Sequence, residues 1–259
     1  MNNDSFKFYS SKSTILRSDN CSDLYNLVTP PENCAVVFQW SHLRKYYIKK
    51  DYKPLPTYVS SCCLTPPNPI DYIKCCVKSL THFIMLFKTT ECKVFGIYIN
   101  RNDLNDNDLN TKKTGGKPSS LEPVSLKLTK PSNETPSFLF SLNHKEILDF
   151  RKLRYDCSND FGVATNYTDK HNTSNLIVFK LIKNETNASK LDNTKLKGTI
   201  QFRFPLIECN GRVLFDIFNR QYRIYRQSQY MTIEMDYEEV EIYAVKEPLT
   251  INLSHNDKA

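Results

Sequence analysis

Apolar and polar residues alternate with a period of two over much of the chain, which predicts strands more often than helices. The clearest pair of strands is THFIMLFK at 81–88 and KVFGIYIN at 93–100, separated by the polar stretch TTEC. Two such runs with a short polar gap are typical of a β-hairpin. The first run is apolar on both faces, so we expect it to lie between layers. Gly96 interrupts the second run and indicates a bulge or a close approach of other backbone.

Further strands are expected at NLIVFKLI (175–182), which is apolar on both faces, and at TIQFRFPL (199–206). In the second of these, apolar and polar residues alternate, so one face should be exposed to solvent. A third run, SFLFSL at 137–142, follows a long polar stretch. It places Phe138, Phe140 and Leu142 on one face. We expect these three side chains to enter the same core as Phe83 and Phe87.

The last strong strand is EEVEIYAV at 238–245. The apolar positions before it, Ile233, Met235 and Tyr237, alternate in the opposite phase. One extra residue near Glu238 would restore the register, so the sequence predicts a β-bulge there.

Helices are expected at only two places, CSDLYNLV (21–28) and HKEILDFRKL (144–153). The spacing of apolar residues at 213–226 fits either a helix or a hairpin. Residues 101–136 are dense in breakers and charges, with one candidate strand at VSLKL (124–128), so we interpret them as a long loop inserted into a single domain. A linker between two domains is the alternative.

Composition sets broad limits on function. The 259 residues are 40% hydrophobic and 24% charged, with a formal net charge of +7. No stretch approaches the roughly 18 apolar residues of a membrane span, and the first residues hold no apolar run typical of a secretory signal. We therefore expect a cytoplasmic chain without a transmembrane segment. The basic charge permits an acidic partner without requiring one.

The chain shows no familiar catalytic or cofactor motif. Its nine cysteines include two adjacent pairs without the spacing of a zinc site, and TGGKPSS lacks the spacing of a phosphate loop. The five histidines are scattered, and His82 falls in an apolar strand, where a core role is expected. We therefore predict no catalytic residue, no cofactor and no metal.

Two charged stretches are candidates for binding a partner. Arg223 and Arg226, together with Arg220, interleave with Tyr222 and Tyr225 in RVLFDIFNRQYRIYRQ. Glu239 and Glu241 belong to the acidic stretch MDYEEVEI. Arginine and aromatic residues together could stack bases and neutralise phosphates, whereas the acidic stretch could dock a basic protein. The simpler interpretation of each is a solvated face, and acid–base chemistry by the carboxylates comes third.

Three of these segments, in this order, resemble the TLDc domain family: KTTECKVFGIYIN, then SFLFSLN after a variable loop, and finally EEVEIYAV. STILRSDNCSDLYNLV and YYIKKDYKPLPTYVSSC resemble the family's opening segments. The chain departs from the pattern at Tyr52, where the family has Gly, and at Tyr243, where it has Trp. The glycine-rich stretch of the second half shrinks to Phe161-Gly162.

The resemblance implies an α+β, mainly β fold: two packed antiparallel sheets, a β-sandwich, with a few peripheral helices. Its boundaries would be an N-terminal extension at 1–13, a single domain at 14–245 containing the inserted loop at about 101–136, and a C-terminal tail at 246–259. Family members are associated with oxidative-stress protection and with the vacuolar proton pump.

The sequence therefore predicts a non-enzymatic, intracellular protein-interaction domain that binds the vacuolar proton pump or another large assembly, with Glu239, Glu241, Arg223 and Arg226 as candidate contacts. Two alternatives stay open. One is a divergent enzyme using a thiol or a carboxylate pair, and the other is a basic binder of single-stranded nucleic acid.

Overall fold

The protein is described here by a computed structural model, in which residues 13–16, 28–29, 34–42, 69–104, 124–128, 137–149, 177–183, 196–203, 223–227 and 230–251 are placed. Strands dominate these residues, and helices are few, so the prediction of a mainly β fold is confirmed. The helical elements include α4 (Pro69–Lys78) and the 3-10 helix η1 (Arg101–Asp103). The strands are β1 (Val28–Thr29), β2 (Cys34–Gln39), β3 (His82–Thr89), β4 (Val94–Asn100), β5 (Val124–Leu128), β6 (Phe138–Ser141), β7 (Glu146–Asp149), β8 (Ile177–Lys183), β9 (Leu196–Arg203), β10 (Arg223–Gln227), β11 (Tyr230–Val245) and β12 (Thr250–Ile251).

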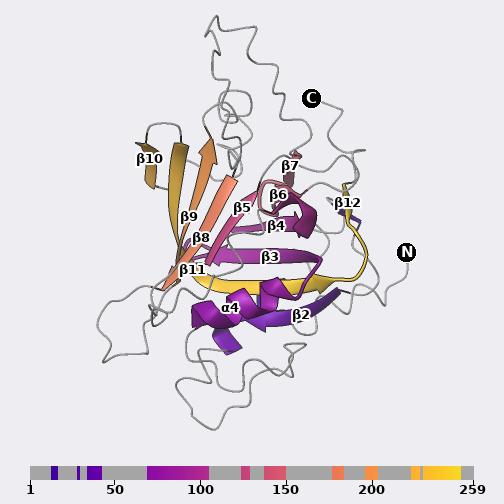
Figure 1. Cartoon of the computed structure of the whole chain (residues 1–259). Coiled ribbons are helices and arrows are strands. Elements are labelled where there is room, and N and C mark those ends of the chain that lie inside the picture. Colours follow the sequence, from indigo (N-terminus) through magenta and orange to yellow (C-terminus); the bar gives the residue numbers. More distant parts are fainter. Residues whose placement is uncertain are drawn as a thin grey trace, which may run out of the picture.

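Most of these strands belong to one antiparallel sheet of ten strands (Figure 1). Its order is β5-β8-β9-β11-β3-β4-β6-β7, and β10 and β2 also pair with β11. β1 and β12 form a separate two-stranded sheet. None of the described helices is long and apolar enough to cross a membrane.

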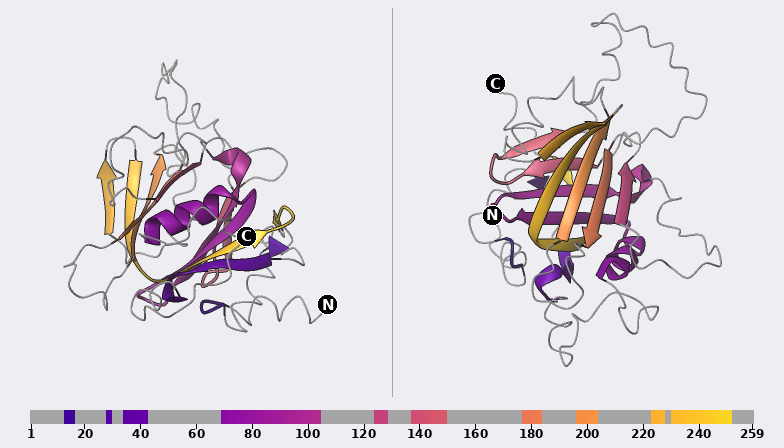
Figure 2. Two further views of the ribbon diagram at one scale, coloured as in Figure 1. Left: turned by 60° about the horizontal axis from the view of Figure 1, so that its bottom comes forward. Right: turned by 90° about the vertical axis from the view of Figure 1, so that its left-hand side faces the viewer.

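The 16-residue strand β11 connects the two halves of the large sheet. Its first half pairs with β9 and β10, and its second half pairs with β3 and β2. The register against β3 shifts between Tyr237 and Glu239, which confirms the predicted bulge. Figure 2 (right) shows the result: strands of the first half stand upright in front of the horizontal β3 and β4.

The predicted hairpin is confirmed as β3 and β4, which pair from His82↔Asn100 to Lys88↔Val94. The turn between them places Cys92 at a φ of 62°, in the left-handed region. Buried apolar residues lie on both faces of β3, as predicted.

The two faces of β3 belong to different hydrophobic clusters. The first cluster contains Phe83 and Phe87 together with residues of both halves of the sheet and of α4. The second cluster, on the opposite face, contains Ile84 and Leu86, and it also takes up Phe138, Phe140 and Leu142. The expectation that these last three share a core with Phe83 and Phe87 is therefore wrong. Side chains alternate between the two faces of a strand. Phe138, Phe140 and Leu142 fall on the face of the sheet that carries Ile84 and Leu86, and not on the face that carries Phe83 and Phe87.

SFLFSL is nevertheless a core strand, as predicted, because β6 pairs with β4 and its residues are buried. Gly96 of β4 lies opposite Phe140. A Cβ atom at Gly96 would lie 2.2 Å from Cζ of Phe140. The glycine therefore makes room for a side-chain ring of the neighbouring strand, whereas the sequence indicates a bulge or a close approach of other backbone.

The helix predicted at 144–153 is wrong where the structure describes that segment. Residues 146–149 form β7, which pairs with β6 after a tight turn. Lys145 in this turn has a φ of 56°. The local apolar spacing fits a helix, but hydrogen bonding to the edge of β6 decides the conformation.

Other expectations have mixed outcomes. The strands predicted at 175–182 and 199–206 correspond to β8 and β9, with shifted ends. VSLKL is a strand, β5, which pairs with β8. Residues 223–227 form β10, whose partner is β11. Of the helix predicted at 21–28, only Val28 is described, and it lies in β1; residues 21–27 lie outside the described residues, as do most of the loop at 101–136 and residues 213–222.

Candidate functional site

The two arginines singled out by the sequence lie in the edge strand β10. Arg223 pairs with Glu234 and Arg226 with Met231 of β11. Positions three apart in a strand fall on opposite faces, because faces alternate with a period of two. By their positions in the strand, Arg223 and Arg226 therefore fall on opposite faces of β10.

The acidic stretch of β11 is divided between surface and interior. Asp236 and Glu238 are exposed, whereas Glu239 is 5% and Glu241 0% exposed. The prediction that Glu239 and Glu241 lie on a solvated strand face is therefore wrong. The bulge shifts the alternation of β11 by one residue, so that Glu239 and Glu241 point to the opposite face from the one expected without it. Other segments of the chain cover these two side chains.

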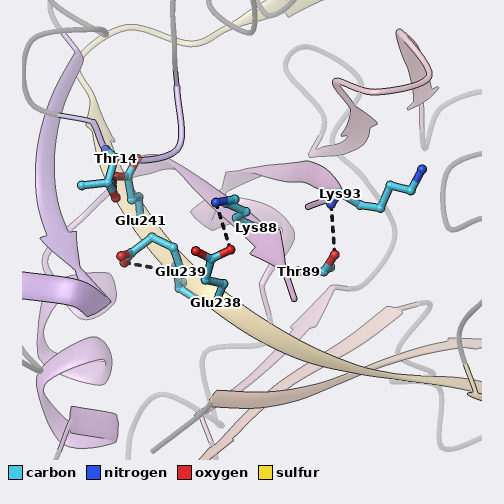
Figure 3. Close-up of polar contacts among 8 residues, drawn as sticks. Thr14, Lys88, Thr89, Lys93, Glu238, Glu239 and Glu241 are labelled. Carbon is cyan, nitrogen blue, oxygen red and sulfur yellow. Dashed lines mark hydrogen bonds and ion pairs between the residues drawn. The ribbon is translucent and has the colours of Figure 1, made fainter. Parts of the chain in front are cut away.

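The carboxylate of Glu241 accepts five hydrogen bonds, four of them from groups distant in sequence. Three come from residues 13 and 14: from Ser13 Oγ at 2.6 Å, Thr14 N at 2.6 Å and Thr14 Oγ1 at 2.9 Å. Figure 3 shows Thr14 beside Glu241. Gln39 Nε2 donates at 2.8 Å from β2, and the Tyr243 hydroxyl donates at 2.6 Å from β11 itself. All five donors are neutral, so among the described residues this carboxylate is solvated by hydrogen bonds.

Glu239 lies two residues earlier and binds the residues that follow β2. Its two oxygens accept from the backbone N–H of Ser41 at 3.0 and 3.1 Å. Burial raises the pKa of Glu239, and the nearby charge of Glu241 acts in the same direction, while the hydrogen bonds from Ser41 oppose both. Desolvation disfavours the charged form of a carboxyl, which explains the sign.

Glu238 faces outward and pairs with Lys88 of β3. The Lys88 Nζ to Glu238 Oε2 distance is 2.9 Å, and the two side chains are 22% and 53% exposed (Figure 3). An ion pair that is this accessible to water contributes little stability. Glu234, Asp236 and Glu238 thus carry the exposed acidic charge of β11.

This geometry indicates what the carboxylates do. Glu239 and Glu241 are occupied by hydrogen bonds from the chain's own backbone, hydroxyl and amide groups. A general acid or base has to reach a proton of the substrate. The described contacts instead use both carboxylates to hold residues 13–16 and 39–42 onto the sheet.

Histidines and cysteines give no assembled reactive group within the described ranges. His82 lies parallel to the ring of Tyr98, at a centroid distance of 6.3 Å, and burial lowers its pKa. Cys34 and Cys76 are buried, and Cys92 is exposed. Among the described residues, no three His, Cys, Asp or Glu side chains gather as metal ligands would.

Sequence reasoning identified Glu239 and Glu241 as a notable pair but missed their partners. Ser13 and Thr14 are 228 and 227 residues from Glu241 in sequence, and Gln39 is 202 residues away. No local pattern connects such distant residues. The available signal was that two acidic residues alternate with apolar ones in this strand, and such residues demand partners if they are buried.

The chain was compared with protein-family models, with curated proteins and with solved structures, and none of the three comparisons gave a match.

Proposed function

We propose that this chain is a non-enzymatic protein-interaction domain of TLDc type. Its partner would be a large assembly, and the vacuolar proton pump is the one that the resemblance suggests, with protection against oxidative stress as the associated process. We place this activity in the cytoplasm.

The observation that supports the proposal is the arrangement of the three segments that carry the resemblance. KVFGIYIN forms β4, SFLFSL contains β6, and EEVEIYAV is the second half of β11. They lie within four consecutive strands of the sheet, in the order β11-β3-β4-β6. Unrelated apolar strands that matched by chance would not have to be neighbours.

We further propose that the two halves of the sheet are the two layers of the β-sandwich expected for this family. β11 would then be shared between the layers, because its halves pair with different strands on either side of the bulge. The first cluster supports this interpretation, since it combines Met85 and Ile97 from one half with Ile200, Ile233 and Met235 from the other.

The use of the buried carboxylates supports a binding role over a catalytic one. Glu239 and Glu241 stabilise the fold from within, which leaves exposed charges such as Asp236 for contact with a partner. Exposed charges at an interface mainly change the association rate and its salt dependence.

The test is an affinity capture. The full chain, carrying a tag, is exposed to an extract of its native cell, and mass spectrometry identifies what is retained. We expect a stoichiometric assembly, weakened by Asp236→Lys and by salt. Glu247→Lys is the matched control, because it makes the same charge change at another exposed position.

Two outcomes would contradict the proposal. One is a capture that retains no stoichiometric assembly. The other is a purified chain that turns over a substrate and loses this activity, at unchanged stability, through a single Cys→Ser substitution.

A further inference from the structure

We draw no further inference here: the strongest candidate, a pH-sensitive contact between the buried carboxyl of Glu239 in β11 and the backbone N–H of Ser41, rests only on the pKa of this carboxyl, which burial raises.

Discussion

The contact between Gly96 and Phe140 gives a quantitative test of the pairing between β4 and β6. An added Cβ at Gly96 would lie 2.2 Å from Phe140 Cζ and 2.7 Å from Leu86 Cδ2. Carbon atoms in good contact are about 3.5 to 4.0 Å apart, so the ring would have to move by more than about 1 Å. Phe140 is fully buried, and overpacking of such a core costs about 1 to 3 kcal/mol. Gly96→Ala should therefore destabilise the protein by about that much.

A double-mutant cycle separates this clash from other effects. Phe140→Ala alone should cost about 3 to 5 kcal/mol through lost burial and the cavity left behind. In that background the ring is gone and Leu86 can shift into the space it leaves, so Gly96→Ala should cost much less than in the unmodified chain. The expected coupling between the two substitutions is therefore about 1 to 3 kcal/mol. Urea denaturation measures all four free energies of unfolding, and Phe140→Leu can replace the Ala variant if that variant is too unstable.

Gly198 provides the matched control. A Cβ there would lie 2.2 Å from Cε2 of Tyr237, a residue of the other cluster. Gly198→Ala should also destabilise, but it should show no coupling with Phe140→Ala. Coupling below about 0.3 kcal/mol between Gly96→Ala and Phe140→Ala, or equal coupling at Gly198, would refute the described packing of β4 against β6.

Three further predictions concern charge and topology. In the folded protein, the carboxyl group of Glu239 should stay protonated at pH values above its ordinary pKa of 4.5. The unmodified chain should therefore lose stability relative to Glu239→Gln as the pH rises from about 4 to 7. Parallel curves of stability against pH would contradict the raised pKa. Exchanging Lys88 and Glu238 for each other should change stability by less than about 1 kcal/mol, because both side chains are partly exposed, and a larger loss in thermal melts would show a stronger pair. A protease site inserted between residues 105 and 123 should yield two fragments that coelute in gel filtration. The reason is that β3 and β4, in the N-terminal fragment, form hydrogen bonds with β11 and β6, in the C-terminal fragment. Fragments that separate while each stays folded would show two domains.

The sequence by itself determined the features that depend on neighbouring residues. The β3–β4 hairpin, the burial of β3 on both faces and the core strand in SFLFSL all follow from local apolar patterns. The bulge near Glu238 follows from a reversal of phase inside β11. These predictions succeeded because the two-residue period of a strand is visible without knowing its partners.

Tertiary structure decided whatever depends on a distant partner. Residues 146–149 are a strand because the edge of β6 supplies their hydrogen bonds, although their spacing also fits a helix. Glu239 and Glu241 are buried because residues 13–16 and 39–42 supply donors, and most of these donors are about 200 residues away in sequence. A charged residue in a strand shows only that water or donors must surround it, and the fold determines which of the two does so.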